Sequence, residues 1–518
     1  MTESRVHKSL LNAKVNLVFY FLSLFFAFFS RKIFLDSLGA EFIGLTGTLG
    51  NILGYLNLAE LGIGTAITFH LYKPLQTNNT DQLNEIISLL GYLYKIIGTI
   101  IFSIAIIISI FFPFIFQSEK IGLPIIYFSF YSFLCSTMIG YFINYKQIIL
   151  SADQKNYVIN IYFQSANIAK TIIQIILAYK IKNPYIWVFT ELLFSILACI
   201  ILNWKISKEY AWLNIDTKNR HKLLKKYPNI ITNTKQIFIH KIKDFLLMKS
   251  DEIFIFMFVS LKMVAFYGNY IMITSKITML FTSLLDGVHA GIGNLVAEGR
   301  KSNILKIFWE MMFIRHFIAG FLVFTIYNLI EPFICLWLGN EYILNKQILF
   351  LLLIYIYIHN SRGVIDSYNH AYGLYADTWS AWVELAINII VTFSLGYSLG
   401  ITGILIGKIS CFVPIVIFWK PYYLFKSGFK LSYWTYWKEA IKFYAIFFLT
   451  FIIGNIISNQ IPINPYSNYL LWILYSAIII IEYLIINLTF LLIFTKGAKT
   501  CIIRIPIIRK LQQNKDIK

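Results

Sequence analysis

Long apolar runs that recur along the whole chain constrain its fold more than any other feature. The run from Ile96 to Phe116 is largely apolar. It is long enough to cross a bilayer as a helix, because a hydrocarbon layer about 30 Å thick needs roughly 20 apolar residues. In that layer a helix satisfies its own backbone hydrogen bonds. The sequence therefore predicts an all-α polytopic membrane protein and excludes a soluble one.

The composition agrees with this prediction. Of 518 residues, 58% are hydrophobic and 14% are charged, against about 25% charged in soluble domains. The net charge of +20 does not indicate nucleic acid, because Lys and Arg are scattered between apolar runs. The five cysteines lack the short spacings of metal or redox sites. We therefore expect no nucleic-acid partner, no metal and no cofactor.

Polar breaks divide the chain into about fourteen predicted spans. They are residues 15–35, 42–72, 86–116, 123–150, 157–179, 185–206, 237–261, 264–297, 304–330, 348–372, 381–399, 401–425, 441–457 and 469–494. Four segments follow: an N-terminal six-helix bundle at 1–207, a basic linker at 208–236, a second six-helix bundle at 237–430, and two extra helices with a basic tail at 431–518.

Basic clusters predict the orientation in the membrane. They lie near residues 5–14, 218–226, 300–306, 420–430 and 496–510. When the spans are counted from the N-terminus, all of these segments fall on the same side of the membrane. Short loops rich in Lys and Arg stay cytoplasmic. We expect a multi-pass protein of the bacterial cytoplasmic (inner) membrane with both termini cytoplasmic. The first span follows the basic start without a small-residue cleavage site, so no peptide is expected to be removed.

Short sequence matches that lie six spans apart indicate a parallel repeat. Gly62-Ile-Gly64 is matched by Gly291-Ile-Gly293, and Trp204-Lys205 by Trp419-Lys420. Such doubling is typical of secondary transporters, whose site lies between the halves.

Glycines in the second span share one helical face. Gly44, Gly47, Gly50 and Gly54 are spaced three, three and four apart, so we assign them, with the Gly-Ile-Gly pairs, to close helix packing. A sliding interface in alternating access uses the same feature.

Many ionisable residues fall at membrane depth, which indicates a polar cavity. Our candidates for substrate or ion translocation are Arg31, Glu60, Lys249, Asp251, Asp286, His289, Arg315, Arg362 and Asp366. Snorkelling or structural pairing competes with function at each of them. Cations would suit a diphosphate, and carboxylates would suit a driving proton or sodium ion. Lys170, Glu191, Glu252, Glu384 and Lys408 are further charged residues inside predicted spans.

No catalytic or nucleotide-binding motif is recognisable, so we expect no catalytic residues and no enzyme. Gly403 to Lys408 is too short for a phosphate loop and lies in an apolar run. The outer connections are too short to hold the chemistry of a membrane polymerase.

One long segment, SRKIFLDSLGAEFIGLTGTLGNILGYLNLAELGIGTAITFHLYKPL from Ser30 to Leu75, strongly resembles the opening of the bacterial polysaccharide (O-antigen or capsule) flippases. These belong to the multidrug/oligosaccharidyl-lipid/polysaccharide exporter superfamily. Further matches, in the same order, are FYGNYIMI from Phe266, AGIGNLVAEG from Ala290, EPFICLWLGNEYIL from Glu331 and AYGLYADTWSAWVELAINIIV from Ala371.

The resemblance implies two six-helix bundles around a central cationic cavity, plus two final helices. It implies ion-coupled movement of an undecaprenyl-diphosphate-linked oligosaccharide to the outer leaflet. Implied partners are that lipid-linked oligosaccharide, membrane lipid, a proton or sodium ion, and, as candidates, a polysaccharide polymerase and a chain-length regulator. The matching motif positions are Arg31, Glu60, Asp251, Gly291, Asn294 and Arg362. Lys408 and His289 depart from the pattern.

We therefore expect a flippase for surface polysaccharide precursors. The alternatives are a drug or cation exporter on the same scaffold, which would prefer an acidic cavity, a membrane polysaccharide polymerase, and a non-transporting assembly scaffold.

Overall fold

The computed structural model describes residues 5–57, 63–117, 119–215, 223–224, 226–228, 250–286, 292, 295–296, 299–374 and 377–503. These residues form helices and connecting turns, and no strand occurs among them. The predicted all-α fold class is confirmed. The chain divides into two compact units, Met1–Ala265 and Phe266–Lys518.

Eleven helices in the described part of the chain are long and apolar enough to cross a membrane. Their ranges are Lys14–Leu38, Thr80–Ile110, Leu123–Phe142, Asn156–Ile181, Pro184–Glu209, Lys301–Trp337, Lys346–Ala371, Thr378–Leu399, Ile401–Phe429, Tyr433–Ser458 and Tyr469–Phe494. The three remaining predicted spans, 42–72, 237–261 and 264–297, contain residues that the structure does not describe. The chain is a multi-pass membrane protein, and the count of fourteen spans stays a prediction.

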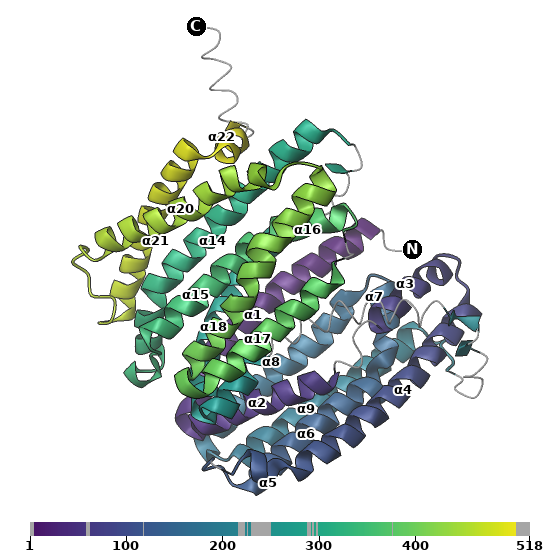
Figure 1. Cartoon of the computed structure of the whole chain (residues 1–518). Helices are drawn as coiled ribbons and strands as arrows, with labels where there is room; N and C mark the ends of the chain where they lie inside the picture. Colours follow the sequence, from purple (N-terminus) through teal and green to yellow (C-terminus); the bar gives the residue numbers. More distant parts are fainter. Residues whose placement is uncertain are drawn as a thin grey trace. The chain divides into compact units, whose positions relative to one another are not determined.

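The first unit is built from long helices that pack side by side (Figure 1). In chain order the main ones are α1 (Arg5–Leu38), α2 (Ala40–Leu56), α3 (Ile63–Gln76), α4 (Thr80–Ile110), α6 (Leu123–Phe142), α8 (Asn156–Ile181) and α9 (Pro184–Glu209). α1 packs on α8, α8 on α9, α9 on α6, and α6 on α4. Short segments α5 (Phe112–Ile115), η2 (Asn144–Gln147) and α7 (Ile148–Ala152) complete it.

Local signals fix several helix ends in this unit. Gly39 has φ of 86° between α1 and α2, a conformation that glycine adopts without steric cost. The Asn79 side chain accepts a hydrogen bond from the Gln82 backbone N–H at 3.0 Å and caps α4. Asn183 caps α9, whose first residue is Pro184. The sequence therefore specifies where these spans begin.

The second unit is arranged around its longest helix. α14 (Lys301–Trp337) packs against α15 (Lys346–Ser361), α20 (Tyr433–Ser458), α21 (Tyr469–Phe494) and α22 (Lys496–Ile503) (Figure 1). The remaining helices are α16 (Gly363–Ala371), α17 (Thr378–Leu399), α18 (Ile401–Phe412) and α19 (Lys420–Tyr423). α12 (Leu261–Asp286) runs from the first unit into the second.

Aromatic side chains dominate the core of the second unit. Phe308, Tyr368 and Phe425 are fully buried there, with Phe429 beside them. The Phe308 ring lies edge-on to those of Tyr368, Phe425 and Phe429, with centroids 5.3 to 5.6 Å apart. Edge-to-face pairs add to the burial energy of such rings. This cluster joins α14 to α16 and to the chain that follows α18.

Ionic contacts tie the turn between α7 and α8 to the end of α9. Lys155 Nζ lies 2.8 Å from Asp153 and 2.7 Å from Glu209. The Tyr210 hydroxyl donates a hydrogen bond to Asp153 at 2.9 Å. Burial and the charge of Asp153 raise the pKa of Tyr210, so its hydroxyl remains a donor. This network connects segments that are more than fifty residues apart in sequence.

We expect this network to give a pH-dependent stability. Burial alone would lower the pKa of Lys155, but the hydrogen bonds to Asp153 and Glu209 raise it above its usual 10.5. Because the folded pKa is raised, the stabilisation is complete below pH 10.5 and is lost as the pH rises through the folded pKa. Thermal unfolding of the purified protein should show Lys155→Met less stable than the parent by about 1 kcal/mol at neutral pH. The difference should vanish at strongly alkaline pH; a constant difference would contradict the assignment.

Candidate functional site

Several predicted site residues lie outside the described residues. They are Glu60, Gly62, Lys249, His289, Gly291, Gly293 and Asn294. Asp286 is the last residue of α12, and its side chain is not described. Their roles stay predictions. The others fall into two groups, one in each unit.

In the first unit, Arg31 and Asp251 lie near the contact of α2 with residues 250–265. Arg31 Nη2 donates to the backbone oxygen of Ala265 at 3.0 Å, and Asp251 is buried. Next to Asp251, Glu252 accepts a hydrogen bond from the Asn51 side chain of α2. Glu252 is therefore held against α2, and Arg31 against the start of α12.

The glycines of α2 differ in their surroundings. A Cβ at Gly44 would lie 1.8 Å from the backbone oxygen of Leu261, so only glycine fits there. A Cβ at Gly47 would meet Glu252 at 3.4 Å, and one at Gly50 would meet nothing within 4 Å. Gly54 lies in the same helix. In α3, a Cβ at Gly64 would lie 3.5 Å from the Tyr94 hydroxyl.

In the second unit, Arg315, Arg362 and Lys408 lie in one region of the fold together with His359; we call these four residues the cation cluster. The Tyr355 ring links them, because its centroid lies 5.7 Å from that of His359 and 5.4 Å from that of Phe412. Arg315 comes from α14, Arg362 from the junction of α15 and α16, and Lys408 from α18. Arg315 is 8% exposed and Lys408 is 3% exposed. Charge at this depth is costly to maintain, so such residues usually serve a function.

Aromatic rings and a glycine position these cations. Lys408 Nζ lies 4.4 Å from the centroid of the Tyr355 ring, and the Arg362 guanidinium lies 5.3 Å from that of Phe412. Ring faces attract cations, more strongly where water is excluded. A Cβ at Gly363 would lie 3.0 Å from Arg315 Cζ. The absent side chain therefore leaves room for the guanidinium.

A carboxylate accompanies Arg362, and another carboxylate is buried in α17. Asp366 lies 3.4 Å from Arg362 Nε, one helical turn away. Glu384 of α17 is 1% exposed. His359 Nδ1 is buried and has no hydrogen-bond partner among the described residues. The arrangement combines anion-binding groups with groups that exchange protons.

The structure thus brings together four predicted charged residues, Arg315, Arg362, Asp366 and Lys408, although Lys408 departs from the family pattern. It also adds His359 and Tyr355, which sequence reasoning missed. His359 lies three residues before Arg362, on the same face of a helix, which is a signal for including it.

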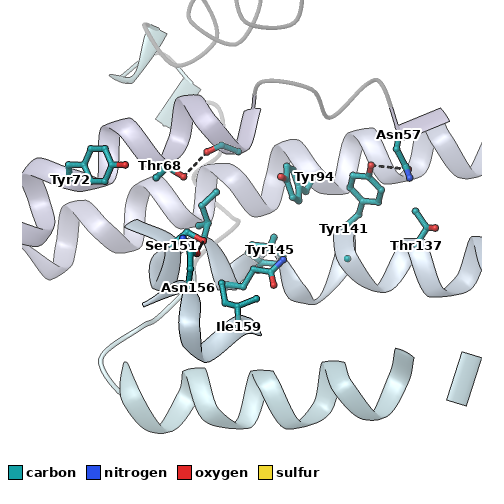
Figure 2. A pocket seen from close by; sticks show the side chains of 14 residues that line it. Asn57, Thr68, Tyr72, Tyr94, Thr137, Tyr141, Tyr145, Ser151, Asn156 and Ile159 are labelled. Atoms are coloured by element: carbon teal, nitrogen blue, oxygen red, sulfur yellow. Dashed lines mark hydrogen bonds between the residues drawn. The ribbon is translucent and has the colours of Figure 1, made fainter. Parts of the chain in front are cut away.

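The first unit contains a second candidate site, a pocket of about 800 Å³ whose described lining residues carry no charge. Figure 2 shows polar side chains from α3, α4, α6 and the chain around α7 converging on it. We call it the neutral pocket, because no described lining residue is charged; its polar residues include Asn57, Thr68, Tyr94, Tyr141, Gln147 and Asn156. Of the predicted residues only Gly64 lines it.

Two glycines of α4 shape the wall of the neutral pocket. A Cβ at Gly91 would lie 2.8 Å from the Tyr145 ring, and one at Gly98 would lie 3.1 Å from Tyr141. The Tyr141 hydroxyl donates to Asn57 at 3.0 Å, which fixes its direction (Figure 2). The tyrosines are therefore held in place by packing on both sides.

A smaller cavity of about 430 Å³ adjoins the neutral pocket and shares Thr137, Gly140 and Gln147 with it. Lys170 lines this cavity and forms an ion pair with Glu191 at 2.6 Å. Within the described ranges no group of three His, Cys, Asp or Glu residues is arranged to hold a metal ion.

The sequence matches no protein-family model and no curated protein. Solved structures do match. A structure titled "Lipid II flippase MurJ, inward closed conformation" aligns with a TM-score of 0.65 and 14% identity over 93% of this chain and 99% of that chain. An inward-facing multidrug resistance MATE family transporter of the MOP superfamily aligns with a TM-score of 0.58 and 15% identity, over 81% and 99%. The chain therefore has the helical fold of these transporters.

Proposed function

We propose that this chain is a flippase of the MOP superfamily that moves an undecaprenyl-diphosphate-linked oligosaccharide across the cytoplasmic membrane. It works by alternating access and is coupled to a proton or sodium gradient. The similarity of its fold to a lipid II flippase and to a MATE transporter supports the transport part. The sequence resemblance to polysaccharide flippases supports the oligosaccharide part.

The cation cluster is the observation that carries this proposal. A diphosphate has several acceptor oxygens and binds best to converging Arg and Lys side chains. Arg315, Arg362 and Lys408 come from three apolar segments, and their contacts with Gly363, Phe412 and Tyr355 place them in one region of the second unit. A site for cationic drugs would instead concentrate carboxylates, and a polymerase would need catalytic residues.

The acidic partner of Arg362 and the histidine of the cation cluster support ion coupling. Asp366 lies 3.4 Å from Arg362 Nε. A bound diphosphate and a carboxylate compete for the same cations, so binding of a proton or sodium ion at the carboxylate would strengthen phosphate binding. Through this competition, an ion gradient would control the binding of the substrate.

Removal of one cation should strongly reduce transport. In vesicles containing the purified protein and a fluorescent undecaprenyl-diphosphate-linked sugar, Arg362→Ala should lower the flipping rate about 10- to 100-fold, the value of one charge-assisted contact. Arg362→Lys should retain part of the rate, because it keeps the charge without the bidentate geometry.

Lys301→Ala is the matched control, because Lys301 is exposed at the start of α14 in the same unit. It should flip at the parental rate. Failure of the parental protein to move this lipid, or equal rates for Arg362→Ala and Lys301→Ala, would refute the proposed function. Export of a cationic dye by the parental protein would favour the drug-exporter alternative.

A further inference from the structure

We propose that the neutral pocket of the first unit binds uncharged pyranose rings of the transported headgroup. This inference rests on the proposed function and assigns a second, separate part of the substrate. The neutral pocket, considered within the first unit alone, would hold neutral sugar.

The chemistry of the lining favours sugar over phosphate or lipid. Hydroxyl and carboxamide groups each donate and accept hydrogen bonds, as sugar hydroxyls do. The described lining offers such groups from Asn57, Thr68, Gln147 and Asn156, without a formal charge. A phosphate or an acidic sugar would call for cations. An acyl chain could make no hydrogen bond with Gln147, whose Oε1 has no partner within the described residues, and this costs free energy.

Tyrosine rings supply the apolar contact that a pyranose also needs. One face of a pyranose exposes C–H groups, which pack on an aromatic ring. The Tyr94 and Tyr141 rings lie 5.6 Å apart at 65° to each other, and so present two differently oriented surfaces. Gly91 and Gly98 hold Tyr145 and Tyr141 closely. A preorganised wall of this kind reduces the entropy lost on binding.

A polar atom without a protein partner points to a ligand. Gln147 Oε1 is buried and has no hydrogen-bond partner within the described residues. Gln147 lines both the neutral pocket and the adjoining cavity. A buried carboxamide oxygen in this position costs free energy unless something donates to it. A rotation of the Gln147 side chain into the neutral pocket would let a sugar hydroxyl satisfy it.

The size and charge of the combined space suit more than one sugar. The volumes of about 800 and 430 Å³ are in the range of small-molecule sites. In the adjoining cavity Lys170 is paired with Glu191 at 2.6 Å, so this pair adds no net charge. On the topology proposed above, Tyr72 near the end of α3 and Ser151 in α7 place the neutral pocket toward the cytoplasm, where the headgroup is assembled.

Protection of an engineered thiol tests sugar binding directly. A Cβ at Gly140 meets nothing within 4 Å, and Gly140 lines the neutral pocket. Gly140→Cys would be made in the full chain with the five native cysteines replaced by alanine. Neutral sugars such as glucose, galactose and N-acetylglucosamine, at high millimolar concentration, should slow maleimide modification several-fold. Glucuronate and inorganic phosphate should not slow it.

The matched control carries Thr77→Cys as the single cysteine. Thr77 is exposed in the turn between α3 and α4, where water can reach it, and it does not line the neutral pocket. The rate of its modification by maleimide should be the same with and without each sugar. Adding Gln147→Leu to the Gly140→Cys protein should abolish the protection, and the oxygen it removes has no protein partner to lose. Absence of protection by all neutral sugars, or equal protection by glucuronate or phosphate, would overturn the proposal.

A bulky side chain that fills the neutral pocket tests this proposal independently of the proposed function. Gly140→Phe should lower binding of undecaprenyl-diphosphate-linked neutral oligosaccharide by the purified protein to the level of bare undecaprenyl diphosphate. Binding of the bare lipid should be unchanged, whereas Arg362→Ala should weaken both. Cys135→Phe adds the same bulk outside the pocket and should bind both lipids normally.

The two failures look different. If Gly140→Phe still prefers the sugar-bearing lipid as the parent does, the pocket proposal fails and the flippase proposal stands. If neutral sugars protect Gly140→Cys but the parental protein flips no lipid-linked sugar, the pocket stands and the flippase proposal fails.

Discussion

Replacing Gly403 by alanine should destabilise the second unit more than any other single methyl addition in α18. A Cβ at this position would lie 2.2 Å from the backbone oxygen of Leu395 and 2.9 Å from the backbone nitrogen of Gly396. Backbone atoms cannot rotate away as a side chain can, so α17 and α18 would have to separate. We expect a loss of about 3 kcal/mol and a marked fall in the melting temperature of the detergent-solubilised protein.

Gly140→Ala is the matched control for Gly403→Ala. Both glycines lie inside apolar helices, but a Cβ at Gly140 meets nothing within 4 Å. Alanine there should be neutral or should stabilise by up to about 1 kcal/mol, because alanine favours helix more than glycine does. If both variants melt like the parent, the close approach of α17 and α18 is wrong.

The lengths of the apolar runs in the sequence predict most of the membrane-spanning helices. The predicted spans 157–179, 185–206 and 469–494 correspond closely to α8, α9 and α21. Hydrophobic length fixes these helices because hydrocarbon permits few alternatives for the backbone. The two C-terminal helices after the second group of spans were predicted for the same reason.

Helix breaks inside apolar runs are harder to predict. The expected span 123–150 ends as α6 at Phe142, and η2 and α7 follow as separate short helices. Asn144 is buried there and accepts a hydrogen bond from Asn203 of α9 at 2.8 Å. The expected span 348–372, by contrast, agrees with the continuous apolar stretch Lys346–Ala371, in which α15 and α16 meet at Arg362 with helical backbone angles. The break after Phe142 involves a tertiary contact of a polar residue, which hydropathy does not register.

Charged residues were easier to single out than neutral polar ones. Arg315, Arg362 and Lys408 were conspicuous because charge in a membrane span is costly, but their meeting at His359 depends on how three helices pack. The neutral pocket left no comparable signal, because Asn57, Tyr94 and Asn156 are ordinary residues scattered over a hundred positions. Only the packing of seven segments, from the end of α2 to α8, turns them into a site.

The ion pair of Lys170 and Glu191 should show strong coupling between α8 and α9. The two charges are 2.6 Å apart, and their side chains are 15% and 24% exposed. Gln174 also donates to Glu191, at 3.2 Å. Lys170→Met leaves a largely buried carboxylate, and Glu191→Leu leaves a largely buried ammonium. Each single change should cost about 3 kcal/mol, since removal of one partner leaves an uncompensated charge.

The double variant Lys170→Met/Glu191→Leu should recover most of this loss, because two apolar side chains of similar size remove both charges together. Thermal unfolding of the four proteins gives the coupling energy as a double-mutant cycle. Lys442→Met provides the comparison, since Lys442 pairs with Glu439 at 2.9 Å but is 38% exposed, and its loss should cost less than about 1 kcal/mol. Additive effects of the two single changes would show that the charges do not interact, and the adjoining cavity would then contain a lone cation that favours acidic rather than neutral sugars.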